Sequence, residues 1–572
     1  MADRPLDFAL ARLREALANI HVPLQMPSAT AAADYAKRQV SQLDDYILPR
    51  LAQENAPLLA VVGGSTGAGK STLINSLAGR TVSPASVLRP TTRVPTLVYN
   101  LADASWFESD RVLPHLVRTK TETDDPNLLR LSPVPTLPAG MAILDAPDVD
   151  SIVAENRQLA TQLMDAADLW IFLTTAVRYA DAVPWDHLQQ AAERDATVVI
   201  VLNRVPKSAL AEVSAYLRQM LTERGLAETK LFCIPEIDQL HEGRLPDEYI
   251  QELKTWLSDL AGNLAARRLA SVQTMSGAIN AMSRNIPKVI DAIEEQQIKV
   301  TQLRTMSTRA YSEASSRIME NTADGTLLRG EVLAKWHDFV GTGQFFRAVE
   351  QKIGGLRDRM TAFFSGVPKQ AVELGTAIES GLDVLIRHEA DLAAQRASAA
   401  WEADPSGRAI LAGVSSEITR GSPGLSVAAK ELVTQWQEDV LKLVSETGVE
   451  KRAQARFLAL GVNGVGVALM IFVFSHTGGL VGAEVGIAGG TAVLAQRVLE
   501  AVFGDSAVRK LAQEAKINLD SRIAKLLSTE QYRFDKILDE LKINPDAREQ
   551  LSSILLDVSS TSFVDPRLSQ VS

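Results

Sequence analysis

Hydrophobic residues are spaced in two different ways along this chain of 572 residues. Near the N-terminus, Leu6, Leu10 and Leu13 recur every three or four positions, which predicts helices. Further along, the pattern changes to short continuous apolar runs separated by polar stretches with helical spacing. Such runs are typical of strands that are buried on both faces of a parallel sheet. We therefore predict N-terminal helices, forming a neck, over residues 1–56 and an α/β domain over residues 57–262.

The apolar runs of the α/β domain give its expected strands, at 58–62, 141–144, 169–173, 198–202 and 231–234. The stretches between them, such as 155–167 and 209–224, have the spacing of amphipathic helices. Strands that alternate with helices along a chain form a mostly parallel sheet with helices on both faces.

Beyond residue 262 the spacing is helical throughout. Long amphipathic stretches over 263–456 predict an elongated all-α bundle, or stalk. The segment 457–475 contains no charged residue, and its length is close to the roughly 20 residues that span a hydrocarbon core. We expect an apolar helical hairpin over 457–504 and a C-terminal helical segment with a tail over 505–572.

This hairpin has two interpretations, insertion into a membrane or burial inside the helical bundle. Basic residues flank it on both sides, with Arg452 and Arg456 before it and Arg497 and Arg509 after it. Positive charge on both flanks places both ends in the cytoplasm under the positive-inside rule. We therefore favour a membrane hairpin at the cytoplasmic face of the cell membrane, with membrane lipid as a partner.

Composition narrows the function classes. Hydrophobic residues make up 46% and charged residues 22%, as in ordinary folded proteins. The net charge of −10 argues against general nucleic-acid binding, which needs a cationic surface. The single cysteine, Cys233, cannot form an internal disulfide, which favours a reducing compartment.

A complete Walker A motif follows the first expected strand and opens a helix. In this motif the glycines allow backbone N–H groups to surround phosphate oxygens, and the helix N-terminus adds a favourable dipole. Lys70 is expected to reach the β- and γ-phosphates, and the Ser71 hydroxyl to bind Mg²⁺. The predicted nucleotide-binding residues here are Gly64, Ser65, Thr66, Gly67, Ala68, Gly69, Lys70, Ser71 and Thr72.

Two further segments complete the predicted metal site. Asp145 ends the strand 141–144, where P-loop proteins place a carboxylate that holds Mg²⁺, usually through water. Thr92 lies in the loop 89–96, where a threonine can bind Mg²⁺ through its hydroxyl and sense the γ-phosphate. An ordinary polar loop is the alternative for the second segment.

The residues just after Asp145 have a plainer expectation. Asp148, Asp150 and Ser151 are predicted to be turn and helix-capping residues rather than catalytic ones.

The order Gly-Gly-Ser-Thr-Gly-Ala-Gly-Lys-Ser, Arg-Pro-Thr-Thr-Arg-Val-Pro and Leu-Asp-Ala-Pro-Asp resembles the bacterial dynamin-like GTPases, in particular those of actinobacteria. The resemblance implies a GTPase that uses Mg²⁺ and couples hydrolysis of GTP to membrane fusion, fission or septum remodelling. It implies that Thr92 acts with Lys70 in catalysis, as the sensor of metal and phosphate. It also implies self-association, through the GTPase head or in larger assemblies, and allows a paired paralogue as partner.

The sequence departs from that family at three places, the first of which is Asp148, where the family's Asp-x-x-Gly switch ends in glycine. Dynamins have Gln-Ser in the P-loop where this chain has Thr66 and Gly67. The guanine-reading motif follows strand 198–202, and here Asn203 and Arg204 are followed by Val-Pro, without the aspartate that accepts hydrogen bonds from guanine. Asn203 fits the motif, and the Arg204 stem is suited to cover the base. GTP is therefore implied by the resemblance, and ATP stays open.

Three other functions are compared with this one. The first is a membrane-tethered regulatory switch of the Era-like kind, which recruits a partner and deforms nothing. The second is a scaffold that binds nucleotide without turnover. An ABC-type transport ATPase is disfavoured because its Leu-Ser-Gly-Gly-Gln motif is absent from the sequence.

Overall fold

The computed structural model describes residues 5–53, 56–83, 94–323, 332, 334–335, 338, 369–447, 471, 499 and 505–564, without positions 124, 152, 194–195 and 238–239. The chain divides into two compact units. Unit 1 comprises Met1–Val22, Pro27–Glu295 and Asn544–Ser572, and unit 2 comprises Pro23–Met26 and Gln296–Ile543.

Unit 1 contains an eight-stranded sheet with the order β3-β4-β2-β5-β1-β6-β7-β8. Neighbouring strands pair in parallel except β2 and β5, which are antiparallel. The mostly parallel sheet predicted from the apolar runs is thus confirmed. The strands are β1 (Leu58–Gly64), β2 (Thr96–Tyr99), β3 (Val117–Thr119), β4 (Leu128–Pro133), β5 (Met141–Asp145), β6 (Leu169–Thr175), β7 (Thr197–Val205) and β8 (Lys230–Pro235).

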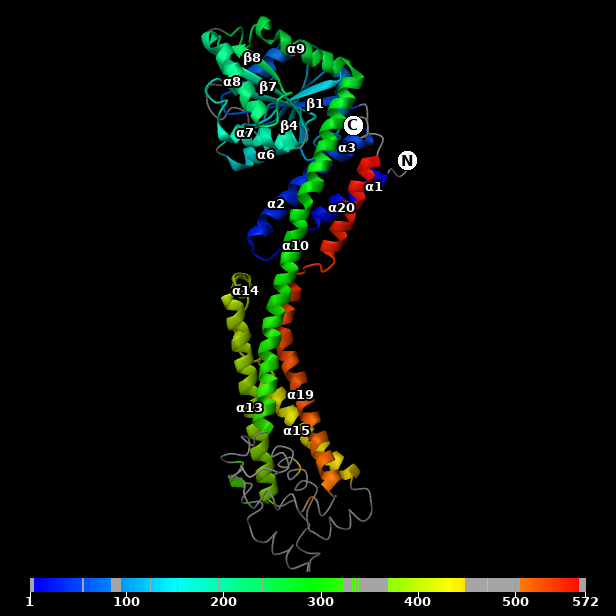
Figure 1. Cartoon of the computed structure of the whole chain (residues 1–572), viewed down its shortest axis with the longest axis vertical. Helices are drawn as coiled ribbons and strands as arrows, with labels where there is room; N and C mark the ends of the chain where they lie inside the picture. The colour runs from blue at the N-terminus through cyan, green and yellow to red at the C-terminus, as the bar shows by residue number, and fades with distance from the viewer. Residues whose placement is uncertain are drawn as a thin grey trace, which may run out of the picture. The chain divides into compact units, whose positions relative to one another are not determined.

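Helices cover both faces of the sheet (Figure 1). Because successive side chains of a strand point to opposite faces, Leu59 and Val61 of β1 join one apolar cluster while Ala60 and Val62 join another. The first cluster includes side chains of α6 (Ala154–Asp165), α7 (Ala182–Glu193) and α8 (Leu210–Glu223). The second includes side chains of α4 (Lys70–Ala78) and α9 (Asp247–Gly262).

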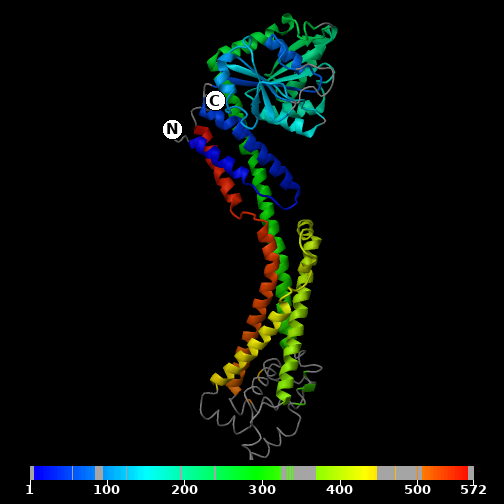
Figure 2. The same cartoon turned by 180° about the vertical axis from the view of Figure 1, so that it is seen from behind.

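Helices from both ends of the chain complete unit 1. They are α1 (Pro5–Ala18), α2 (Pro27–Gln42), η1 (Leu43–Ile47), α3 (Leu48–Ala52) and α20 (Ala547–Val564), together with the part of α10 (Leu264–Ala323) up to Glu295. Figures 1 and 2 show α1 beside α20, and Arg12 forms an ion pair of 2.9 Å with Asp557 between them. Short helices η2 (Leu101–Asp103), α5 (Ala104–Phe107) and η3 (Lys207–Ala209) lie between strands.

Unit 2 is helical in the residues that the structure describes. It contains the remainder of α10, α13 (Lys369–Ala403), α14 (Pro405–Leu411), η5 (Ser416–Thr419), α15 (Leu425–Thr447) and α19 (Asp505–Glu540) (Figure 2). Its core is apolar and contains Trp401, whose ring lies 5.2 Å from that of Phe534. The indole N–H groups of Trp401 and Trp436 donate to the backbone carbonyls of Leu303 and Ala515, each at 2.9 Å. Each buried indole thus has its one donor satisfied.

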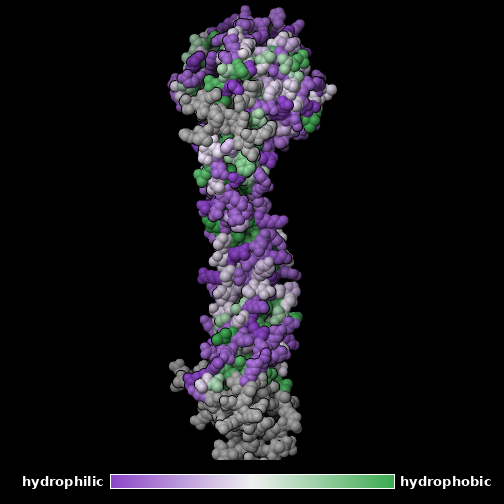
Figure 3. All heavy atoms as spheres, turned by 90° about the vertical axis from the view of Figure 1, so that its right-hand side faces the viewer, coloured by the Kyte–Doolittle hydropathy of each residue, from purple (hydrophilic) through white to green (hydrophobic). Residues whose placement is uncertain are grey.

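The predicted apolar hairpin over 457–504 lies outside the described residues, except for Ile471 and Leu499. Both of these side chains are fully buried and belong to the apolar core of unit 2. Within the described parts of the chain, no helix combines the length and the apolar character needed to cross a membrane. On the face drawn in Figure 3, hydrophilic residues predominate over the described part, with apolar residues in small patches.

Candidate functional site

The predicted P-loop joins the central strand to a helix. Strand β1 ends at Gly64 and α4 begins at Lys70, so the predicted residues from Gly64 to Thr72 form the strand end, the loop and the first helical turn. Gly64 has φ +147°, and a Cβ there would lie 2.1 Å from the Leu173 carbonyl oxygen. Gly69 has φ +98°, and a Cβ there would lie 2.7 Å from the Asn203 side chain. Gly64 requires glycine because a Cβ would clash with the backbone of β6, and Gly69 because its positive φ is one that other residues rarely adopt.

Lys70 is folded back over its own loop. Its side chain is only 4% exposed, and Nζ donates to the carbonyl oxygens of Gly64 at 2.9 Å and Ser65 at 3.2 Å. The same ammonium forms an ion pair with Asp148. The lysine is therefore held beside the loop where a phosphate is expected, with a carboxylate as its counter-ion.

Asp145 lies at the carboxyl end of β5 and is fully buried. Its Oδ2 accepts a hydrogen bond from Ser71 Oγ at 3.0 Å and another from Ser83 Oγ. Burial raises the pKa of Asp145, while the Ser83 bond and the charge of Lys70 act in the opposite direction. Among the described residues, no group donates a hydrogen bond to its other oxygen, Oδ1.

These residues fit a magnesium ion. Mg²⁺ takes oxygen ligands and is usually bound by one or two carboxylates together with water and phosphate oxygens. A buried carboxylate oxygen without a hydrogen-bond partner is costly, and Asp145 Oδ1 is such an atom beside the Ser71 hydroxyl. The structure brings the predicted ligands Ser71 and Asp145 together, whereas the third, Thr92, lies outside the described residues.

The entry to the Thr92 loop is fixed next to Asp145. The Asn75 side chain accepts hydrogen bonds from the N–H groups of Val82 at 2.7 Å and Ser83 at 2.9 Å, and it donates to the Ser83 carbonyl at 2.8 Å. Helix α4 therefore holds Ser83 in place, and the Ser83 hydroxyl reaches Asp145. This arrangement cannot be predicted from the sequence, because a lone Asn in a helix gives no sign of its partner.

Asp148, Asp150 and Ser151 lie in the predicted turn, in which the Ser151 N–H donates to the Asp148 carbonyl at 3.2 Å, but the predicted helix cap is not formed. Helix α6 begins without a side-chain cap, and both carboxylates contact the P-loop instead. Asp148 pairs with Lys70, while Asp150 Oδ1 accepts hydrogen bonds from the Thr66 N–H at 2.7 Å and the Thr66 hydroxyl at 2.8 Å. Two carboxylates thus bind donors of the P-loop, one on the Lys70 ammonium and the other on Thr66.

Asn203 lies near the end of β7 and turns toward the P-loop. Its Nδ2 donates to the Ala68 carbonyl at 2.9 Å, and its Oδ1 accepts from the Arg204 N–H at 2.9 Å. Arg204 has φ +55° and an exposed side chain. The predicted pair therefore lies beside the loop, with Asn203 linking β7 to it and the Arg204 stem free of the core.

Of the comparisons with known proteins, the one with solved structures finds similar chains. No protein-family model matches the chain, and comparison with curated proteins finds no match. The chain is similar to an oligomerised bacterial dynamin pair, described as a mechanism for long-range sensing and tethering of membranes, with TM-score 0.39 and 12% identity over 98% of this chain and 96% of that chain.

Two other solved structures have lower scores. LeoA, a bacterial dynamin GTPase from ETEC, has TM-score 0.23 and 13% identity over 98% of this chain and 97% of its own. Era from Aquifex aeolicus, bound to GDP and AlF₄⁻, has TM-score 0.24 and 20% identity over 35% of this chain and 57% of its own. Scores this low fix no correspondence between residues, so the function has to follow from the chain's own site.

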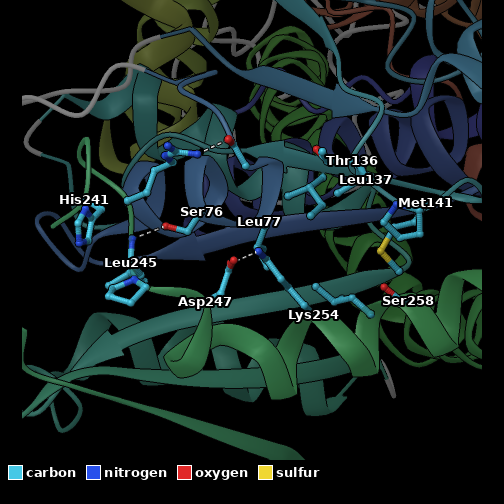
Figure 4. A pocket seen from close by; sticks show the side chains of 16 residues that line it. Ser76, Leu77, Thr136, Leu137, Met141, His241, Leu245, Asp247, Lys254 and Ser258 are labelled. Atoms are coloured by element: carbon cyan, nitrogen blue, oxygen red, sulfur yellow. Dashed lines mark hydrogen bonds and ion pairs between the residues drawn. The ribbon is translucent and has the colours of Figure 1, made fainter.

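A separate cavity lies at the other end of α4. It has a volume of about 540 Å³ and is lined by Ser76 and Gly79 from the end of that helix and by Met141 from the start of β5. Figure 4 shows it bounded by the ion pair between Asp247 and Lys254 of α9. The P-loop lies at the opposite ends of the same elements, so this cavity is distinct from the phosphate site.

Proposed function

We propose that this chain is a magnesium-dependent GTPase that acts on membranes in the manner of dynamin-like proteins. One observation carries the proposal: a buried aspartate, Asp145, keeps one carboxylate oxygen without a hydrogen-bond donor next to the Ser71 hydroxyl, beside a complete P-loop. That arrangement suits a cation and a phosphate better than it suits the protein alone.

Each of the proposed site residues has its own role in binding the phosphates and the metal ion. Ser71 and Asp145 hold Mg²⁺, with Thr92 as the third proposed ligand. When bound, this ion stabilises the negative charge that develops on the phosphate oxygens during phosphoryl transfer. Lys70 exchanges Asp148 for the phosphate oxygens, so its buried charge stays compensated throughout. The loop glycines allow the backbone N–H groups to approach the same oxygens.

The preference for GTP rests on the motif order and on Asn203. The position of Asn203 at the end of β7, bonded to Ala68 of the P-loop, supports a base site formed by these two segments. Arg204 supplies an exposed aliphatic stem for the face of the base. Because the guanine-binding aspartate is absent, we expect discrimination between GTP and ATP to be weaker than a site with that acceptor achieves.

The membrane part of the proposal rests on the charge-free segment 457–475, on the basic residues around it and on the resemblance of the motifs. Membrane lipid is the proposed partner, at the cytoplasmic face of the cell membrane, and self-association through the GTPase unit or in a larger assembly is proposed with it.

The second candidate is an Era-like regulatory switch that recruits a partner and deforms no membrane. The burial of Ile471 and Leu499 in the core of unit 2 favours this candidate, since it places both side chains away from lipid. Nucleotide-dependent lipid mixing or liposome tubulation supports the dynamin-like function, whereas partner recruitment without either supports the switch.

The site is tested by Lys70→Ala. We expect binding of fluorescent GTP to be lost and GTP turnover to fall by at least about a hundredfold, because the phosphate charge loses its main counter-charge. Lys207→Ala, at an exposed lysine after β7, is the matched control and should keep wild-type binding. Turnover of GTP and ATP is measured with and without anionic liposomes. Wild-type turnover by the Lys70 variant contradicts the assigned site.

A further inference from the structure

An arginine outside the predicted motifs contacts the P-loop. Arg178 lies just after β6, in a turn where its backbone N–H donates to the Thr175 carbonyl at 3.0 Å. Its Nη1 donates to the Thr66 carbonyl at 2.9 Å and to Asp150 Oδ2 at 2.9 Å, and its Nε lies 3.2 Å from Asp181. The side chain is 37% exposed, so it has room to change partners.

Asp150, which holds this arginine, also accepts a hydrogen bond from a backbone N–H of the P-loop. Asp150 binds the guanidinium through one oxygen and the Thr66 N–H through the other. Burial alone raises the pKa of Asp150, but the hydrogen bonds from Thr66 and the charges of Arg178 and Lys70 outweigh it and lower the pKa. The Asp150 carboxylate is therefore an anion that binds a backbone N–H of the P-loop and lies close enough to Lys70 to feel its charge.

We propose that Arg178 is a catalytic arginine supplied by the chain itself, which leaves Asp150 and binds the oxygens of the terminal phosphoryl group in the transition state of hydrolysis. This inference rests on the proposed function and deepens it. An arginine is suited to the exchange because its charge is permanent and its planar fork binds carboxylate and phosphate in similar ways. In this exchange the guanidinium moves from the Asp150 carboxylate, beside Thr66, to a phosphate bound at the same loop.

The reaction that Arg178 assists is hydrolysis of the terminal phosphate. A bond forms between the water oxygen and the γ-phosphorus as the bond from that phosphorus to the β,γ-bridging oxygen breaks, and GDP leaves with the electron pair. One water proton stays on the product HPO₄²⁻ and the other is released, so that GTP⁴⁻ and water give GDP³⁻, HPO₄²⁻ and H⁺. Negative charge grows on the bridging oxygen during this step, and a guanidinium placed there stabilises it.

A purely structural role is the competing explanation, in which Arg178 only clamps Asp150 and Asp181 to the P-loop. The clamp predicts that removing the guanidinium weakens binding of every nucleotide state, because the loop loses its shape. A catalytic arginine predicts a selective loss in the transition state, with binding of GDP and GTP preserved.

The experiment compares the wild-type chain with Arg178→Ala, Arg178→Lys and the control Arg218→Ala, at an exposed arginine of α8. For Arg178→Ala we expect kcat to fall by about 10³-fold, with KM and the Kd of fluorescent GDP within about threefold of wild type. The gain in affinity that aluminium fluoride gives to bound GDP should be lost in the same variant. Arg178→Lys should recover little, because lysine lacks the planar fork, and Arg218→Ala should match wild type.

Three results overturn the inference. Arg178→Ala with wild-type kcat and an intact aluminium fluoride effect shows that the guanidinium is dispensable. Equal weakening of GDP, GTP and the aluminium fluoride complex shows a clamp. Recovery of turnover when Arg178→Ala is mixed with Lys70→Ala shows an arginine that acts on a second copy of the chain. A wild-type chain that neither binds nor hydrolyses nucleotide contradicts the proposed function as well, which separates that failure from the other three.

Discussion

In unit 1, one aspartate is buried at the end of a central strand and another just before the start of a central strand. The two carboxylates differ in how many of their oxygens accept hydrogen bonds. Asp145 and Asp168 are both fully buried, and their strands β5 and β6 lie on either side of β1. At Asp168, Oδ1 accepts from the Tyr46 hydroxyl at 3.1 Å and from Ser271 Oγ at 3.0 Å. Asp145 has donors on Oδ2 alone among the described residues.

The other oxygen of Asp168 is also satisfied. Its Oδ2 accepts from the Leu59 N–H at 2.7 Å and forms an ion pair with Arg50. This one side chain therefore joins α3, the first residues of β1 and the start of α10. A buried charge whose lone pairs are all used holds segments of the fold together, whereas one with a spare oxygen is suited to bind a ligand. The difference separates a structural aspartate from the one that we propose as a metal ligand, although both are equally buried.

The largest effect is expected from Asp168→Ala. The substitution leaves Arg50 buried without its counter-ion, and its side chain is only 10% exposed. Removal of one partner from a buried pair costs about 3–5 kcal/mol of the free energy of unfolding. Urea unfolding followed by tryptophan fluorescence measures the loss, which should occur with or without nucleotide.

Tyr46→Phe is the graded control for the same network. It removes one hydrogen bond to Asp168 and should cost about 1 kcal/mol. If Asp168→Ala unfolds at the wild-type urea concentration, the aspartate is not the structural anchor described here, and the comparison with Asp145 loses its basis.

A smaller change in stability and a larger change in ligand binding are expected from Asp145→Asn. The variant should lose about 10–100-fold in Mg²⁺ affinity, because the oxygen that we assign to the metal no longer carries charge. Its free energy of unfolding should stay the same or rise, since the substitution removes a buried charge that lacks a full set of donors. Titration of Mg²⁺ into the complex with fluorescent GDP measures the affinity.

The pH dependence of the same Mg²⁺ titration tests whether Asp145 is the group that binds the metal. Burial raises the pKa of Asp145 above its ordinary value, so the folded state keeps a proton at pH values where the unfolded chain has lost it. Through this group alone, the free energy of unfolding falls as pH rises through that interval. Mg²⁺ needs the ionised form, so its affinity falls as pH drops through the raised pKa. A wild-type pH profile that persists in Asp145→Asn assigns the step to another residue.

Much of the sheet could be predicted from the sequence because its central strands are buried on both faces. The five continuous apolar runs became β1, β5, β6, β7 and β8. Strands β2, β3 and β4 were missed because their signals are weak: β3 has three residues, and β4 alternates half-buried with buried side chains. Short strands of this kind are defined by their pairing partners, which a local pattern does not contain.

The candidate site likewise contains residues that the sequence predicts and residues that it does not. Walker A residues and Asp145 were predictable because each follows a buried strand at a known spacing. Asp150 and Arg178 were not, since they meet at Thr66 only after two separate loops are brought to one edge of the sheet. The sequence does offer one sign, the acidic residue at position 148, where the switch motif that this segment resembles ends in glycine.

The smallest effect is expected from Asp148→Asn, which tests whether the carboxylate competes with phosphate for Lys70. The nucleotide has to separate the buried pair of Lys70 and Asp148, and a closed pair lowers the fraction of molecules that are ready to bind. Asparagine keeps the shape and can still accept a hydrogen bond, but it gives up the charge. We therefore expect fluorescent GDP to bind about three- to tenfold more tightly, while Asp186→Asn, at an exposed position of α7, leaves the affinity unchanged. Unchanged or weaker binding by the Asp148 variant shows that this carboxylate supports the occupied site instead of competing with its ligand, and Asp148 then belongs with Asp168 as a structural residue.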